Sequence, residues 1–240
     1  MHDTTASEIS NLQYYAAIAI FLITYAIIIS EKINRAVIAM LGAALMIIFG
    51  IVDVHKAFTH HIEWGTITLL IGMMILVGIT SKSGFFQYVA IKTAKLAKGR
   101  PLRILVMLSL LTGTLSAFLD NVTTVLLIVP VTFSITRMLQ VNPVPYLISE
   151  VLFSNIGGTA TLIGDPPNIM IGSANKHLDF NAFLFNLAPI VLIIMIVTVS
   201  ILAFIYRRQL KTDEKLVNQL LSVNEAEYIK DAALLKKSVS

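Results

Sequence analysis

The sequence lacks cysteine altogether and carries few charged residues. Without cysteine, the 240-residue chain can have neither a disulfide framework nor a thiolate metal site. Only 13% of its residues are charged, about half of the ~25% that is usual for a soluble domain. The net charge of +4 rests on scattered residues, which does not suggest a nucleic-acid binder. The whole chain is 56% hydrophobic, with a mean hydropathy of +0.81, and this composition indicates an integral membrane protein.

Long apolar runs without charge are the main feature of what is present. A helix needs ~20 mostly apolar residues to cross a hydrocarbon core of ~30 Å. Such runs cover residues 12–30, 36–52, 66–80, 146–176 and 182–206. The run 146–176 is interrupted at its centre. We therefore predict an all-α integral membrane protein with about five spanning helices. A cleaved signal peptide is not expected, because no lysine or arginine precedes the first run.

The middle of the chain is less regular. Residues 85–98 are amphipathic, with apolar side chains on one helical arc and Lys92, Lys95 and Lys98 on the opposite arc. This pattern predicts a helix in the membrane interface, with a connecting helix packed on the protein as the alternative. Two apolar arms follow, 104–118 and 122–136.

The two arms flank a short polar segment. Each has 15 residues, which is only ~22 Å as a helix and is short of a full span. Leu119, Asp120 and Asn121 lie between them. We predict a re-entrant helical hairpin whose tip stops near mid-membrane; two short tilted spans are the alternative.

The run 146–176 contains helix-breaking residues at its centre. These are three glycines and two prolines: Gly157, Gly158, Gly164, Pro166 and Pro167. Glycine weakens a helix by ~1 kcal/mol and proline by ~3 kcal/mol per interior position. In lipid, a broken backbone survives only when it is buried in protein or lines a wet cavity. The sequence therefore predicts a broken helix that faces inward. Glu150, about one turn into this run, is expected to extend toward the cytoplasmic interface.

Polar side chains gather at both breaks, in segments that are otherwise apolar. The candidate substrate- or ion-binding residues are Asp120, Asn121, Thr123, Thr124, Asn155, Gly157, Gly158, Thr159, Thr161, Asp165 and Asn168. A charged side chain at membrane depth costs at least ~2.5–3.5 kcal/mol on insertion scales, so the two aspartates need a compensating role or a wet environment.

Helix ends inside the membrane suggest that role. A helix beginning at Asn121 and another near Pro166 would point positive ends into a cavity, where anions are favoured. Carbonyl groups beside Gly157 and Gly158 could hold a small cation, as in secondary transporters with broken helices. The simpler alternative is that Asp165 only caps the helix that follows it.

Other polar residues at the breaks have a simpler explanation too. Asn155 and Thr159 could serve only to bond neighbouring helices. His55, His60 and His61 have no acidic cluster of metal-ligand spacing beside them, so no metal site is expected. The chain also has no membrane-embedded histidine and no recognisable nucleophile motif, which argues against an intramembrane enzyme.

The basic residues predict the orientation. Of the 18 lysines and arginines, all but Lys56 and Lys176 fall on one side of the proposed topology. Because cytoplasmic loops carry the excess of basic residues, the N-terminus is expected outside and the C-terminus in the cytoplasm. We therefore expect a multi-pass protein of the cell (plasma or inner) membrane. The chain divides into five regions: extracytoplasmic N-tail 1–11, scaffold helices 12–83, interfacial helix 84–100, transport region 101–206 and cytoplasmic linker or tail 207–240.

Three segments resemble a known superfamily. They are EWGTITLLIGMMILVGITSKSGFF, AFLDNVTTVLLIVPV and NIGGTATLIGDPPNIMIGS. They are similar to the signature regions of the ion transporter superfamily, whose members carry a citrate transporter-like domain. These include arsenical pump membrane proteins, P protein permeases, citrate-type carriers and divalent-anion:sodium symporters. The likeness runs from about Val37 to the end of the chain and is greatest to the P protein and arsenical-permease branch.

The resemblance implies a site and an assembly. In this superfamily the first break is the tip of a cytoplasmic re-entrant hairpin, and the second is the unwound part of the next helix. The tip is matched by Asn121 and Thr123, and the unwound loop by Asn155, Gly157, Gly158, Thr159 and Asn168. A sodium ion at Asn121, Asn155 and Gly158 is one implied possibility. Members are commonly homodimers with a moving, elevator-like transport region.

The chain departs from the superfamily in two ways. Members contain two inverted repeats, whereas this chain resembles the N-terminal half only, so a second repeat or a homologous half is an expected partner. The tip also carries a carboxylate, Asp120, which could bind a proton or Na⁺ or repel an anionic substrate.

These observations lead to an expected function. It is a secondary active permease for anions or oxyanions, of arsenite or citrate type, with ion-coupled alternating access. The partners are the lipid bilayer and a small anion or ion, and no cofactor is expected beyond a coupling Na⁺ or H⁺. Two alternatives stay open: a sodium/proton antiporter, and a non-transporting half that needs a second half.

Overall fold

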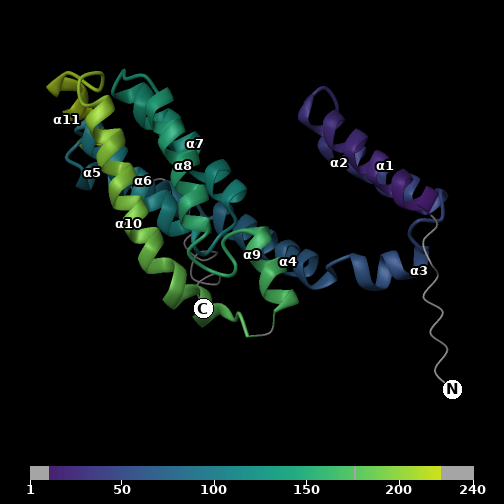
Figure 1. The fold of residues 1–240 in the computed structure, drawn as a ribbon. Coiled ribbons are helices and arrows are strands. Elements are labelled where there is room, and N and C mark those ends of the chain that lie inside the picture. Colours follow the sequence, from purple (N-terminus) through teal and green to yellow (C-terminus); the bar gives the residue numbers. More distant parts are fainter. Residues whose placement is uncertain (1–10, 176, 223–240) are drawn as a thin grey trace. The chain divides into compact units, whose positions relative to one another are not determined.

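The computed structural model describes residues 11–175 and 177–222, and these residues form helices and connecting turns without any strand (Figure 1). Contacts divide the chain into two units, Met1–Glu63 and Trp64–Ser240. Four of the described helices are long and apolar enough to cross a membrane: α1, α4, α7 and α10. The prediction of an all-α membrane protein is therefore confirmed.

The first unit contains a pair of apolar helices. α1 (Asn11–Ile29) packs against α2 (Arg35–Ile48), and the side chain of Asn34 caps α2 by accepting the N–H of Ala36 at 2.9 Å. None of residues 12–29 is buried, and most apolar side chains of α1 are exposed away from α2, as expected of a helix that faces lipid. α2 has 14 residues, which is ~21 Å and shorter than the expected span.

The loop after α2 is partly helical. It contains α3 (Val54–Lys56) and a short π-helical turn, η1 (Ala57–His61). Asp53 begins this segment, because its carboxylate accepts the N–H of Lys56 at 3.0 Å. No helix was predicted between the apolar runs 36–52 and 66–80.

The second unit opens with a long helix and an amphipathic one. α4 (Trp64–Lys82) covers the expected third span. α5 (Phe85–Leu96) packs against α4, α6 and α7 and buries Phe86, Ala90 and Ala94. Its lysines lie outside this buried stripe. The amphipathic helix thus packs its apolar face on protein.

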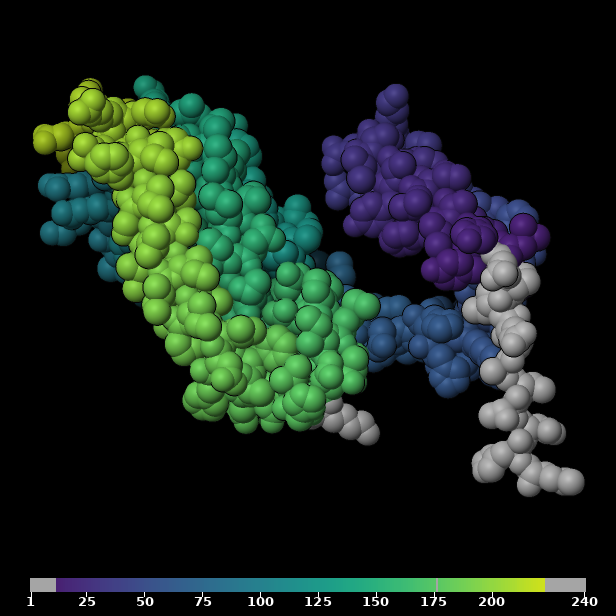
Figure 2. Space-filling model, viewed as in Figure 1, coloured from purple at the N-terminus to yellow at the C-terminus, as the bar shows by residue number. Residues whose placement is uncertain are grey.

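Three helices and a long fourth one form the core of this unit. α6 (Pro101–Ser116), α7 (Asn121–Met138) and α8 (Val144–Gly158) pack on one another, and α10 (Phe180–Tyr206) contacts both α6 and α8. The buried apolar side chains include Ile104, Leu108, Ile128, Ile135 and Phe153. Figure 2 shows α10 as a continuous ridge along the visible face of this unit.

The two expected breaks occur in this core. α6 ends at Ser116 and α7 begins at Asn121, so the polar tip lies where it was expected. The second arm differs from the prediction, because α7 has 18 residues and is itself long enough to cross a membrane. α8 ends at Gly158, and α9 (Pro166–Ala174) follows a non-helical stretch. Gly157 and Gly158 therefore form the last residues of α8 and precede the unwound stretch. Within the predicted tail 207–240, α11 (Glu214–Ser222) packs against α7. Residues 223–240 of this tail lie outside the described residues, as do residues 1–10 of the N-tail and Lys176.

Candidate functional site

The hairpin tip is held by a cap that the sequence analysis did not assign. Asp120 is the N-cap of α7, and its Oδ1 accepts the backbone N–H of Thr123 at 2.9 Å. The backbone carbonyl of Asp120 accepts the N–H of Thr124 at 3.0 Å. α7 therefore begins at Asn121, as predicted, because Asp120 satisfies N–H groups that a helix leaves unpaired at its start.

The second break lacks the side-chain cap that the alternative explanation of Asp165 requires. Asp165 occupies the N-cap position of α9, but its side chain makes no capping hydrogen bond. The reason lies in the next residues: Pro166 and Pro167 have no N–H to donate. The N–H of Asn168 bonds instead to the backbone carbonyl of Asp165, at 3.0 Å. The alternative that the Asp165 side chain only caps α9 was therefore wrong, and this carboxylate is available for another role.

Side chains and carbonyls join the two breaks directly. The Asn121 amide nitrogen donates to the amide oxygen of Asn155 at 3.0 Å. The Ser116 hydroxyl donates to the backbone carbonyl of Ser154 at 2.7 Å. The Thr161 hydroxyl donates to the backbone carbonyl of Ala117, so the unwound stretch is tied to the end of α6. The tip of the hairpin and the end of α8 therefore meet as one polar region.

Glycines allow this close approach. A Cβ added at Gly157 would overlap the backbone carbonyl of Gly113 in α6. At the last residue of α8, a Cβ at Gly158 would lie 2.8 Å from the carbonyl oxygen of Gly164 in the unwound stretch, closer than real side chains come. Both glycines are thus needed for packing, whatever else they bind. Their carbonyl groups are part of the polar region that the tip faces.

Asn168 folds the unwound stretch back on α8. Its amide nitrogen donates to the carbonyl of Thr161 at 2.9 Å and to that of Gly158 at 3.3 Å. The Asn155 amide also donates to Val151 in its own helix, at 2.8 Å. These bonds fix the orientation of both amide groups, so their oxygens point in defined directions.

The candidate residues separate by burial. Thr124, Thr161, Gly157 and Gly158 are buried, and the Thr124 hydroxyl has no hydrogen-bond partner. Asn155 and Thr159 are exposed. The rest are half-buried: Asp120, Asn121, Thr123, Asp165 and Asn168. The polar region is therefore open on one side, where Asn155 and Thr159 lie.

The two carboxylates belong to this region. Asp120 and Asp165 lie close enough to interact electrostatically. Each stands immediately before a helix, so the positive ends of α7 and α9 approach the same place. The region thus combines two carboxylates, two amides and hydroxyl groups at the ends of three helices.

Sequence reasoning missed the residues that hold the breaks together. Gly113 and Ser116 are three residues apart on α6, and Ser154 and Gly157 are three apart on α8. Small residues on one face of a helix let membrane helices approach closely. This signal was present in the sequence, although it does not say which two helices meet.

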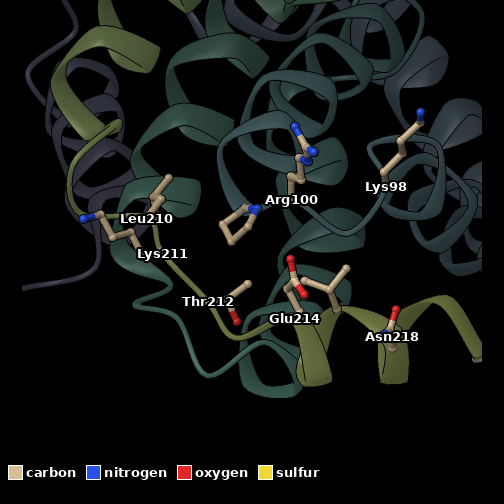
Figure 3. Close-up of a pocket in the computed structure, with 9 residues that line it drawn as sticks. Lys98, Arg100, Leu210, Lys211, Thr212, Glu214 and Asn218 are labelled. Atoms are coloured by element: carbon tan, nitrogen blue, oxygen red, sulfur yellow. The ribbon is translucent and has the colours of Figure 1, made fainter.

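A cavity of about 550 Å³ lies beside the first residue of α6, Pro101, at the opposite end of this helix from the breaks. Figure 3 shows the side chains that line it. The cavity is lined by Lys98, Arg100 and Lys211, with Glu214 and Asn218 from α11. α6 has 16 residues, so ~24 Å of helix separates this cavity from the polar region. The cavity is therefore distinct from the candidate site, and no candidate residue lines it. Within the described ranges, no group of three or more histidines and carboxylates could hold a metal ion.

Known proteins resemble this chain over most of its length. The citrate transporter family model matches residues 25–240. A 46 kDa membrane protein of Mycobacterium leprae is 46% identical over 224 residues, which are 92% of this chain and 52% of that protein. An uncharacterized transporter of Mycobacterium tuberculosis is 41% identical over 224 residues, with the same two shares. The P protein of Mus musculus is 42% identical over 202 residues, which are 81% of this chain and 24% of the P protein.

These matches confirm the resemblance drawn from the three segments, including its likeness to the P protein. The chain spans about half the length of the mycobacterial relatives and about a quarter of the P protein. The family and its named relatives indicate a transporter and not an enzyme. Apolar helices, two apposed helix breaks and a family match over residues 25–240 together show that this multi-pass membrane protein belongs to the citrate transporter family.

Proposed function

We propose that the chain forms one half of the substrate site of a secondary active permease for anions or oxyanions of the citrate or arsenite type. The hydrogen bond of 3.0 Å between Asn121 and Asn155 supports this most directly, because it joins two helix ends in the middle of apolar segments. Broken helices that meet around polar groups are the usual construction of a transporter site. Transport then proceeds by ion-coupled alternating access.

The helix ends suggest how an anion is held. The positive end of α7 lies at the tip, where the backbone N–H groups of Asn121 and Val122 are not needed within the helix. The Thr123 hydroxyl and the second N–H of the Asn155 amide add neutral donors nearby, whereas the Thr159 hydroxyl already donates to the carbonyl of Ile156 at 2.7 Å. α9 contributes its dipole alone, because its first two residues, Pro166 and Pro167, have no N–H.

The coupling ion is proposed to bind beside the anion. The carboxylates of Asp120 and Asp165 provide negative charge, and α8 presents the carbonyl end of its dipole at Gly158. A sodium ion held by Asn121, Asn155 and Gly158 is one arrangement, and a proton on a carboxylate is the other. Either one would reduce the repulsion between the two aspartates and the anion.

The proposal includes an assembly and an orientation. A second inverted repeat, or a homologous half, would cover the open side of the site, where Asn155 and Thr159 are exposed. Two such proteins would form a homodimer, with the first helices as scaffold and the hairpin region moving. The excess of basic residues supports an N-terminus outside and a C-terminus in the cytoplasm of the cell membrane.

A sodium/proton antiporter is the second candidate. The proximity of Asp120 and Asp165 favours it, since two neighbouring carboxylates can exchange a cation for protons. In that case the amides would only shape the cation site. A third possibility is that the chain does not transport until a second half joins it.

Reconstitution into proteoliposomes separates these candidates. Exchange of labelled citrate or of arsenite across the membrane is expected for the wild type, and Asn121→Ala and Asn155→Ala should each reduce it. Asn186→Ala is the matched control, because this exposed asparagine on α10 bonds only to the carbonyl of Ala182 in its own helix, at 2.7 Å.

The outcomes distinguish the candidate functions and test the site residues. Wild-type rates in both site variants would remove these asparagines from the site. Currents after sodium jumps, without any after anion jumps, would favour the antiporter. Flux that appears only when a second half is co-expressed would identify the chain as a dependent half.

A further inference from the structure

Glu150 is a carboxyl group buried inside the helix bundle. It lies in α8, and only 1% of its surface is exposed. The sequence analysis expected its side chain to reach the cytoplasmic interface, and that expectation was wrong. The side chain is enclosed because α8 is packed by α6, α7 and α10. An ionisable residue within a membrane helix is a candidate for function, since lipid and protein interiors both disfavour its charge.

The two oxygens of Glu150 have different surroundings. Oε1 accepts a hydrogen bond from the Thr132 hydroxyl of α7. Oε2 is also buried, and it has no hydrogen-bond partner. Hydroxyl groups close to Glu150 in sequence or on the facing helix are already used, since Ser149 donates to Pro145 and Thr136 donates to Thr132. Half of the carboxyl group is therefore unsatisfied.

Charged and titratable side chains around α8 do not compensate Glu150. Those on α8 and on the helices packed against it are Arg103 of α6, Arg137 of α7, Tyr146 of α8 and Tyr206 of α10, with Asp120 at the start of α7. Both arginines are exposed, and the Tyr146 hydroxyl donates to the carbonyl of Pro101 at 3.0 Å. In the part of the chain that the structure describes, no cation pairs with Glu150.

An unpaired carboxylate in such surroundings is too costly to persist, and a buried group of this kind takes up a proton instead. We propose that Glu150 is a proton-binding site: it holds a proton while α7 and α8 are packed together, and releases it when they separate and water enters. This inference rests on the proposed function, because it requires a transport cycle in which the hairpin of α6 and α7 moves relative to α8.

The position of Glu150 fits this role. It is five residues before Asn155 on α8, or ~7.5 Å along the helix. The proton site therefore lies between the polar region and the start of α8 at Val144. Thr132 links it to α7, the helix whose first residue, Asn121, contacts Asn155. Loss of the proton would leave a bare charge at this contact and would favour the separated arrangement of the two helices.

Infrared difference spectroscopy tests the proton directly. The purified protein in lipid vesicles should show the carbonyl absorbance of a protonated carboxyl group at neutral pH. Glu150→Gln should lose this absorbance, and Glu150→Asp should keep a protonated carboxyl. Glu214→Gln makes the same chemical change at an exposed glutamate of α11 and should leave the absorbance unchanged. Identical spectra of wild type and Glu150→Gln would overturn the proposal.

A transport measurement tests the consequence. With labelled citrate as the probe, Glu150→Gln should retain exchange across the membrane, because a neutral amide mimics the protonated group. It should lose accumulation driven by a pH gradient. Full pH-driven accumulation in Glu150→Gln would contradict the proposal. If the wild type moves no citrate and no arsenite, the proposed substrate class fails, while the infrared result still decides whether Glu150 binds a proton.

Discussion

At the scale of single residues, the two aspartates at the breaks have different tasks. One carboxylate oxygen of Asp120 accepts the backbone N–H of Thr123, and this hydrogen bond stabilises the start of α7. Asp165 stands before two prolines and has no such donor. Asp120 also repels the carboxylate of Asp165, so removal of the Asp165 charge relieves a repulsion. Asp120 is thus both a structural and a candidate binding residue, whereas Asp165 has no capping task.

This difference predicts opposite effects on stability. Asp120→Ala should destabilise the protein by about 1 kcal/mol, the usual cost of losing an N-cap. Asp165→Ala should leave the stability unchanged or raise it, because no hydrogen bond is lost and a repulsion is relieved. Thermal unfolding of both purified variants in the same detergent measures this. A melting temperature of Asp165→Ala at or below that of Asp120→Ala would contradict the assignment.

At the scale of elements, the contact between α6 and α8 sets the geometry of the site. Gly113 and Gly157 bring the two helices together, and Ser116 bonds to Ser154 one turn away. This contact places the end of α8 beside the tip of the hairpin. The site therefore depends on two helices approaching more closely than larger side chains would allow.

Substitution of a glycine tests that contact. Gly157→Ala forces its new Cβ against the Gly113 carbonyl and should cost about 1–3 kcal/mol, as overpacking does. Gly72→Ala is the control, because this glycine lies in α4 with open space around it, where alanine is the better helix former. The melting temperature should fall for Gly157→Ala only; equal values for the two variants would show that the close contact is absent.

Much of this element order follows from sequence. The uncharged runs gave α1, α4 and α10, because a membrane helix needs length and apolarity more than any specific contact. Glycine, proline and polar residues marked both breaks, since they disrupt a helix wherever it packs. The helix starts at Asn121 and near Pro166 were predicted for the same local reason.

Tertiary contacts could not be predicted in this way. Asp165 makes no side-chain cap because Pro166 and Pro167 have no N–H group, and because the N–H of Asn168 bonds to the backbone carbonyl of Asp165. The burial of Glu150 depends on three neighbouring helices, which its position near the start of an apolar run did not reveal. The pairing of the small residues of α6 and α8 likewise needed the fold.

At the scale of the whole molecule, the exposed apolar surface is that of a membrane protein, and the basic residues predict its orientation. Large apolar side chains are exposed on α1, α4 and α10, where lipid would cover them. The basic residues collect at the ends expected in the cytoplasm. In the proposed topology, the lining of the cavity in Figure 3, with Lys98, Arg100 and Lys211, would lie on that side.

The absence of cysteine makes the orientation easy to measure. His60→Cys and Lys211→Cys each introduce the only thiol of the chain, at an exposed position in each case. In intact cells, a membrane-impermeant thiol reagent should label the cysteine at position 60 and reach position 211 only after permeabilisation. The reverse pattern would invert the proposed topology.

The central claim is that the hairpin tip and the end of α8 face each other, and cross-linking tests it most directly. Asn121→Cys combined with Asn155→Cys should form an intramolecular link with a short bifunctional thiol reagent in native membranes. The reason is that, in the wild type, the Asn121 amide nitrogen lies 3.0 Å from the Asn155 amide oxygen. Leu126→Cys with Asn155→Cys should not, because Leu126 is 68% exposed on another face of α7. Equal linking of both pairs, or none of the first, would contradict a site built from the two breaks.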